Sequence, residues 1–213
     1  MMANFLLIIL VSVSSFVVAV NSLRAGNCYE YGTLPIEIRS LSLSPRTINI
    51  PGISSLHFDL VVRDNVGNDE TPLKARVSMA RLVTIGVGWL SYTYELSIPC
   101  LDMGDGFHIG SCEYDNVCAL VSRFNNVTNN VHCSEADYYG FPCDCPVPAS
   151  RYRTGNKRPI RVDMSQGIDQ LPSAISSILE GEYIMVIEIR KAINDVFADL
   201  LGCFELSFDI AMP

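Results

Sequence analysis

The chain has 213 residues, of which 49% are hydrophobic and only 18% are charged, and its formal net charge is -8. A disordered chain would hold more charge and fewer aliphatic side chains, so the composition predicts one or two globular domains with a substantial core. The acidic balance opposes contact with a phosphate backbone, so we expect no nucleic acid partner.

Residues 1–22 have the pattern of a secretory signal peptide. Residues 5–20 are apolar apart from three serines and hold no charge, and this run is short for a membrane span. Small residues at Ala19 and Ser22 are suited to cleavage by signal peptidase. An uncleaved N-terminal anchor is the alternative. We expect residues 1–22 to be removed and residues 23–213 to form a single secreted domain.

Alternation with a period of two predicts most of the regular structure. Residues 56–62, 90–98 and 204–210 alternate apolar with polar side chains, and residues 183–189 are almost wholly apolar. Pro51-Gly52 and Gly86-Val87-Gly88 punctuate the chain between such runs. The pattern predicts an all-β fold, an antiparallel sandwich or cup.

Two segments have helical periodicity. The first covers residues 113–124, where Val117, Leu120, Val121 and Phe124 share a face. The second begins at Leu171 and ends before Gly181, with Ile175, Ile178 and Leu179 at helical spacing from Leu171. We therefore expect one or two short helices beside the strands.

All eight cysteines follow the expected cleavage site. An even number in a secreted chain favours four disulfides, each contributing about 2–4 kcal/mol to stability. Eight cysteines allow about 105 pairings, so spacing alone assigns none of them. A zinc site of His132, Cys133, Cys143 and Cys145 is disfavoured, because paired C-x-x-C motifs are absent.

Four motifs, read in order, resemble one known family. They are Ile38-Arg39-Ser40-Leu41-Ser42-Leu43 with Pro51-Gly52; Ile98-Pro99-Cys100 with Ile109-Gly110-Ser111-Cys112; Tyr139-Gly140-Phe141-Pro142-Cys143-Asp144-Cys145-Pro146; and Leu201-Gly202-Cys203. Together they resemble the ganglioside G(M2) activator family of sphingolipid activators, in the ML superfamily of lipid-recognition domains. The resemblance covers nearly all of the chain after the signal segment.

The resemblance implies an immunoglobulin-like β-cup with a lipid cavity between two antiparallel sheets. It implies a non-catalytic protein without a cofactor, which takes a glycosphingolipid from a membrane and presents it to a lysosomal β-hexosaminidase. The location would be secreted or lysosomal. The four bridges implied by the family are Cys28–Cys203, Cys100–Cys112, Cys118–Cys145 and Cys133–Cys143.

Candidate side chains for the lipid cavity and its rim are large and apolar. Those on the predicted strands and their turn are Phe58, Leu60, Trp89, Tyr92, Tyr94, Tyr183 and Phe208, and those on the predicted second helix are Leu171, Ile175, Ile178 and Leu179. Trp89, the only tryptophan, follows a glycine-rich turn, where it suits a membrane interface. Ordinary core packing is the alternative for each of them.

A basic loop is expected after the cysteine-rich block. It holds Arg151, Arg153, Lys157, Arg158 and Arg161, which we expect to meet an anionic membrane surface, an acidic sugar or an acidic partner enzyme. A solvated loop without a partner is the alternative. Asn126-Val127-Thr128 is the clear glycosylation sequon, so we expect a glycan on Asn126.

Three other classes of function remain as alternatives. An enzyme needs a nucleophile with a base, or paired carboxylates, yet the chain has three histidines and no G-x-S-x-G motif, so we expect no catalytic residue and no metal site. An extracellular carrier of a sterol, fatty acid or pheromone would need the same fold without an enzyme partner. A purely structural secreted sandwich would hold no lipid at all.

Overall fold

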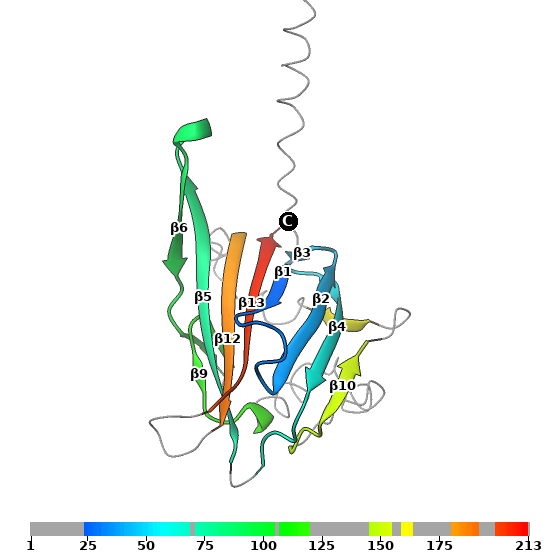
Figure 1. Cartoon of the computed structure of the whole chain (residues 1–213). Coiled ribbons are helices and arrows are strands. Elements are labelled where there is room, and N and C mark those ends of the chain that lie inside the picture. Colours follow the sequence, from blue (N-terminus) through cyan, green and yellow to red (C-terminus); the bar gives the residue numbers. More distant parts are fainter. Residues whose placement is uncertain are drawn as a thin grey trace, which may run out of the picture.

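The computed structural model describes residues 24–68, 71–104, 107–119, 145–154, 159–163, 180–191 and 199–212. In these residues the strands form a seven-stranded sheet, a four-stranded sheet and a two-stranded hairpin (Figure 1). All strand pairs are antiparallel except one in the larger sheet. The all-β antiparallel fold expected from the alternation is confirmed.

The seven-stranded sheet, here called sheet A, contains the longest strands. Its order is β1 (Arg24–Asn27), β13 (Leu200–Ala211), β12 (Gly181–Lys191), β5 (Leu73–Ile85) and β6 (Tyr92–Ser97). β3 (Thr47–Asn49) pairs in parallel with β13, and β9 (Glu113–Tyr114) pairs with β5. β12 and β5 are rich in β-branched residues and β13 contains two phenylalanines, and both residue types are enriched in strands.

The four-stranded sheet, here called sheet B, is built around β4 (Ile53–Val62). β2 (Ile36–Ser44) pairs with one edge of β4, and β10 (Ser150–Arg153) and β11 (Ile160–Asp163) pair with successive parts of the other edge. A separate hairpin joins β7 (Leu101–Gly104) to β8 (Phe107–Ile109).

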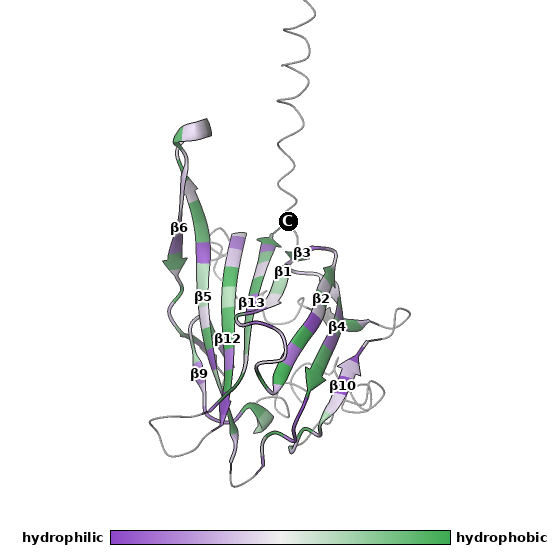
Figure 2. Cartoon of the chain, viewed as in Figure 1, coloured by the Kyte–Doolittle hydropathy of each residue, from purple (hydrophilic) through white to green (hydrophobic). Residues whose placement is uncertain are grey.

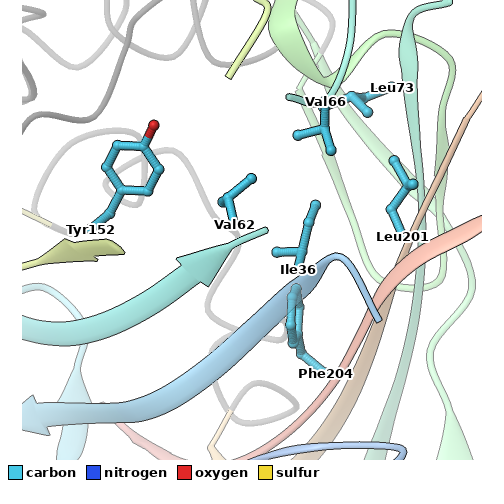
Figure 3. Packing of buried hydrophobic residues seen from close by; sticks show 7 residues of the cluster. All are labelled: Ile36, Val62, Val66, Leu73, Tyr152, Leu201 and Phe204. Carbon is cyan, nitrogen blue, oxygen red and sulfur yellow. The ribbon is translucent and has the colours of Figure 1, made fainter. Parts of the chain in front are cut away.

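The core lies between the two sheets. One cluster of buried side chains draws on both of them, as Figure 3 shows: it contains Ile36, Val62, Val66, Leu73, Tyr152, Leu201 and Phe204. A second cluster contains Tyr183, Leu206 and Phe208, with Leu41 of β2 and Met79 of β5 packed against it. Along β13, Phe204, Leu206 and Phe208 are buried at alternate positions, because successive side chains of a strand point to opposite faces.

The prediction of a helix over residues 113–124 was wrong for its first residues. Glu113 and Tyr114 form β9, in register with Arg76 and Ala75 of β5. Helical backbone begins only at residue 117, where the Asn116 side chain accepts a hydrogen bond from the Ala119 N–H. Pairing with an exposed strand edge offers residues 113–114 more backbone hydrogen bonds than the first turn of a helix. The helix expected from Leu171 lies outside the described residues.

Candidate functional site

The hairpin of β5 and β6 extends past the rest of sheet A. β5 pairs with β12 only as far as Leu82, which lies opposite Glu182, and beyond this point its one strand neighbour among the described residues is β6. A single 3-10 turn, η1 (Gly88–Leu90), lies at the tip between the two strands. Figure 1 shows this tip standing well clear of the ends of β12 and β13.

Glycine makes the turn into η1 possible. Gly86 has a φ of 112°, and a Cβ at this position would lie 2.3 Å from the Leu90 carbonyl oxygen. An L-residue would suffer both a strained backbone and a clash, so the chain can reverse here only with glycine. The reversal places residues 87–90 at the far end of the hairpin.

The side chains of the hairpin are apolar and exposed. Trp89 is 90% exposed and Tyr92 is 71% exposed. Also exposed are Ile85, Val87, Leu90 and Leu96. No charged residue occurs from residue 82 to residue 94. A contiguous apolar surface of this kind on a protein marks a site for an apolar partner.

One face of the hairpin continues the inner face of sheet A. Residues that pair directly in an antiparallel sheet point to the same side. Arg81 lies opposite both Tyr183 and Leu96, Val83 lies opposite Tyr94, and Ile85 lies opposite Tyr92. The inner face therefore runs from the buried core, past Arg81, to the apolar residues of the hairpin tip, and the upper part of β5 is largely green in Figure 2.

At the inner end of this face the aromatic rings are packed tightly. The rings of Tyr183 and Phe208 stack with centroids 5.7 Å apart. Tyr183 is fully buried, and burial raises the pKa of its phenol although the nearby Arg81 acts in the opposite direction. Phe58 and Leu60 of β4 pack against the other core cluster. These four predicted cavity residues thus lie in or against packed clusters of the core.

The basic segment does not form the single loop that we expected. Arg151 and Arg153 belong to β10, and Arg161 belongs to β11, while Lys157 and Arg158 lie outside the described residues. Residues 150–153 and 160–163 form strands because the free edge of β4 offers hydrogen bonds to both. The basic side chains are consequently held in place along sheet B.

Two carboxylates, Asp59 and Glu37, orient Arg151 of this segment and two arginines from elsewhere in the sequence. Arg151 donates two hydrogen bonds to Asp59 and thereby lowers the pKa of that carboxyl, against the opposing effect of burial. Arg153 and Arg39 lower the pKa of Asp59 further. The guanidinium groups are therefore arranged around an ionised aspartate.

Glu37 forms the second such centre and is only 2% exposed. Its carboxylate accepts hydrogen bonds from Arg63 at 2.6 Å, from Arg39 at 3.3 Å and from the Gly32 N–H. Burial by itself would raise the pKa of Glu37, but these three donors outweigh it and lower the pKa. The network fixes the segment before β2 against the end of β4.

The described residues contain three disulfides, with the pairs that the family resemblance implies. They join Cys28 to Cys203, Cys100 to Cys112 and Cys118 to Cys145. The zinc alternative is therefore wrong for Cys145, since its sulfur is already bonded. The implied Cys133–Cys143 bridge lies outside the described residues.

Several other expected features also lie outside the described residues. They are the signal segment 1–22, the sequon at Asn126, and the helix residues Leu171, Ile175, Ile178 and Leu179. In the part of the chain that is described, no helix has the length and apolar character needed to cross a membrane. Among the same residues, no group of three or more His, Cys, Asp or Glu side chains is placed to hold a metal ion.

Sequence reasoning missed two kinds of site residue. Ile85, Val87 and Leu90 join Trp89 at the hairpin, and the uncharged run from residue 82 to residue 94 was the signal for them. Arg39 and Arg63 join the basic segment although they are far from it in sequence. Only the pairing of β2 and β10 with β4 reveals that proximity.

No family model matches the chain. Among solved structures, the chain is similar to a Niemann-Pick type C2 protein from Japanese carpenter ant, over 88% of this chain and 99% of that one, at 11% identity and a TM-score of 0.38. We draw nothing further from a likeness at that level.

The curated relatives are ganglioside GM2 activators. The chain is 32% identical over 127 residues to those of Mus musculus and Macaca fascicularis. This match covers 59% of the chain, 56% of the mouse protein and 57% of the macaque protein. The chain thus spans little more than half the length of the curated relatives it matches. The similarity confirms the resemblance that the motifs indicated.

Proposed function

We propose that the protein is a non-catalytic lipid-binding protein that withdraws an amphiphilic lipid from a membrane. The observation that carries this proposal is the exposed apolar hairpin of β5 and β6. The inner face of this hairpin continues along the side of sheet A that faces the core. The hairpin tip enters the bilayer surface through Trp89, Leu90 and Val87. The inner face then receives the hydrocarbon that leaves the bilayer.

The energetics require a device of this kind. Burial of each CH₂ group is worth about 0.8 kcal/mol, so moving a two-chain lipid from a bilayer into water costs on the order of 20 kcal/mol. A protein offsets this cost only if it shields the chains during transfer. A face that begins at the membrane and ends between two sheets, and is apolar on both sides of Arg81, shields the chains along most of this path.

The finer proposal concerns the cargo and the partner. The similarity to ganglioside GM2 activators supports a glycosphingolipid as the lipid and a β-hexosaminidase as the enzyme to which its sugar is presented. The disulfides support a secreted or lysosomal location, because such bonds persist in oxidising compartments. In this proposal, residues 1–22 are a signal peptide that is removed on secretion, and residues 23–213 form a single lipid-binding domain.

The experiment uses vesicles that contain a radiolabelled ganglioside. Incubation with the protein, followed by gel filtration, should yield soluble protein–lipid complexes. Replacement of both apolar tip residues, as Trp89→Ser with Leu90→Ser, should reduce extraction by about tenfold or more, since it removes most of the apolar area that enters the membrane. The matched control is Tyr29→Ala, which removes an aromatic ring that is 54% exposed outside the hairpin.

The outcomes separate the levels of the proposal. Equal losses for the tip variant and the control would contradict the role of the hairpin. Absence of any extraction by the unaltered protein would overturn lipid binding itself. Ganglioside hydrolysis by β-hexosaminidase should rise when the protein is added, and the protein alone should release no sugar. Extraction without stimulation would instead favour a carrier of another hydrophobic ligand, which mass spectrometry of co-purified lipid would identify.

A further inference from the structure

The outer face of sheet B carries an unusual concentration of arginine. Direct pairing places Arg153 beside Asp59, Arg151 beside Val61 and Arg161 beside Ser55. Between them, Tyr152 and its partner Leu60 point to the core. The three arginines therefore share the opposite face, which is turned away from sheet A.

Two further arginines extend this face across β4. Arg39 occupies the bulge of β2, where the register shifts between Ile38 and Ser40, and it acts on the Asp59 carboxyl. Arg63 follows the last residue of β4 and shares Glu37 with Arg39. We define the arginine face as Arg39, Arg63, Arg151, Arg153 and Arg161.

This face is positive although the protein is acidic. Four of its five arginines interact with the carboxylates of Glu37 or Asp59, and Arg161 is two positions before Asp163 on β11. The chain as a whole has a formal net charge of -8. Positive charge is thus concentrated on one side of one sheet, where it creates a local field of opposite sign to that of the whole molecule.

Three of the five arginines are held in place by carboxylates and are still accessible. Glu37 and Asp59 have side chains that are 2% and 19% exposed, whereas Arg39, Arg63 and Arg151, which they hold, are 44%, 40% and 57% exposed. A guanidinium group has five N–H donors, so one edge can bind a carboxylate while another faces solvent. Fixing the side chains in advance lowers the entropy cost of binding an anion.

The chemistry between the arginines points to a charged polymer as the partner. Ser40, Ser42 and Ser44 of β2 are exposed and small, and Ile53 is the one exposed large hydrophobic side chain among those described in sheet B. Interfaces with folded proteins have an apolar centre with several aromatic anchors. Here the side chains between the arginines are mostly small and polar, and the exposed Tyr31 ring lies under Arg39, with its centroid 5.3 Å from the guanidinium carbon. The surface suited to a bilayer is the hairpin of sheet A, not this face of the other sheet (Figure 1).

We infer that the arginine face binds a linear sulfated polysaccharide. Sulfate and carboxylate groups accept paired hydrogen bonds from guanidinium forks, as other oxyanions do. Arginines two residues apart on one strand are separated by about 6.6 Å, and neighbouring strands by about 4.8 Å. An extended polyanion lying across β10, β4 and β2 therefore contacts several guanidinium groups at once.

The test measures binding of a heparin-derived oligosaccharide by calorimetry over a range of NaCl concentrations. The unaltered protein should bind with an affinity that falls as salt rises, because binding releases counterions. The double variant Arg153→Gln with Arg161→Gln should bind at least about tenfold more weakly and show a shallower salt dependence. Neither residue has an ion pair among the described residues, so the variant should fold normally.

The matched control removes the same charge from sheet A. Arg76→Gln with Arg190→Gln replaces two arginines that pair with Glu113 and Glu188. The affinity of this variant for the oligosaccharide should change less than about threefold, since Arg76 and Arg190 belong to strands of sheet A and not to the arginine face. Equal losses in both double variants would reduce the effect to net charge and overturn the assignment. Binding too weak to detect at low salt would also overturn it.

Two further measurements identify the partner and the residues. A single-stranded DNA of equal charge should bind more weakly, and equal affinity would show a general polyanion surface instead. Anionic vesicles should bind the Arg153 and Arg161 variant as well as the unaltered protein, and a parallel loss would assign the face to membranes. In the unaltered protein, the oligosaccharide should protect Arg151, Arg153 and Arg161 from an arginine-modifying reagent, and full modification would contradict the proposal.

Discussion

Strands β13 and β6 belong to the same sheet and have the same alternating pattern, yet their apolar faces lie in different surroundings. Phe204, Leu206 and Phe208 of β13 are 5–8% exposed. On β6, Tyr92 and Leu96 are 71% and 52% exposed. Both sets of side chains point to the inner side of sheet A.

The difference between the two strands arises from what covers them. β2 of sheet B lies over β13, and Leu41 of β2 packs against the cluster that contains Phe208. β6 lies at the edge of sheet A, and its pairing begins only where β5 is about to leave β12. The same pattern therefore builds a core in one half of the sheet and a free apolar surface in the other.

The largest expected effect tests the covered half of the sheet. Phe208→Ala removes a buried ring that stacks on Tyr183 and should lower the free energy of unfolding by about 3–5 kcal/mol. Tyr92→Ala removes an exposed ring and should lower it by less than about 0.5 kcal/mol. Urea denaturation measures both values. A similar loss for the two variants would show that the hairpin is packed as well as the core.

A slightly smaller effect is expected from the bridge at the inner end of β13. Cys28 and Cys203 are 175 residues apart and tie the segment after β1 to β13. Replacing both with serine should lower the free energy of unfolding by about 2–5 kcal/mol, mainly through a freer unfolded chain. The measurement is urea denaturation of the double variant, with no reductant. A change below about 1 kcal/mol would show that strand pairing alone secures β13.

The packing of β2 over β13 can be weakened through Glu37, which lies near the start of β2. Glu37→Gln should lower the free energy of unfolding at pH 7 by about 1–3 kcal/mol, because it removes charged hydrogen bonds whose arginines are partly exposed. The folded-state pKa lies below the ordinary value of 4.5. The stabilisation is therefore complete above about pH 4.5 and declines as the pH falls further.

Urea denaturation at a series of pH values checks this prediction. The difference in unfolding free energy between the unaltered protein and Glu37→Gln should stay constant from pH 7 to pH 5 and narrow in more acidic solution. A difference that widens under acid conditions would mean that the folded state raises the pKa of Glu37 instead. Glu205→Gln, an exposed residue of β13, serves as the control and should show little change.

The smallest effect on stability and the clearest spectroscopic signal are expected at the hairpin tip. Trp89 is the only tryptophan, and it is almost fully exposed, so its emission should resemble that of tryptophan in water. Addition of phospholipid vesicles should shift the emission to shorter wavelength and reduce quenching by iodide. Unchanged emission in the presence of bound vesicles would place the membrane contact elsewhere, and Tyr29→Ala should behave as the unaltered protein does.

Much of the fold could be predicted from local pattern. The alternations over residues 56–62 and 204–210 correspond to β4 and β13, because period two is a property of the strand itself, and the apolar run 183–189 corresponds to β12. β5 was missed, since Arg81 interrupts its apolar side. The strand expected over residues 90–98 was confirmed as β6, but its residues proved exposed where burial was expected. Cysteine spacing left the pairing open, and only the family resemblance indicated it.

The candidate site could be predicted only in part. Trp89 stood out in the sequence because a lone tryptophan follows two closely spaced glycines. The arginine face could not be seen whole, because Arg39 and Arg63 lie about a hundred residues before Arg151 and Arg153. Their proximity depends on strand order and register in sheet B, which no local pattern records.

The sequence by itself determined that the chain forms strands with alternating apolar and polar side chains and that these strands are cross-linked by disulfides. It could do so because side-chain periodicity and cysteine content are local properties. Only the tertiary structure decided which apolar faces became core and which became free surface, because burial depends on whether a second sheet lies opposite. It also converted an expected basic loop into ordered strands, because β4 had an edge able to pair with them. Long-range pairing, rather than composition, placed the hairpin and the arginine face on different sheets of the protein.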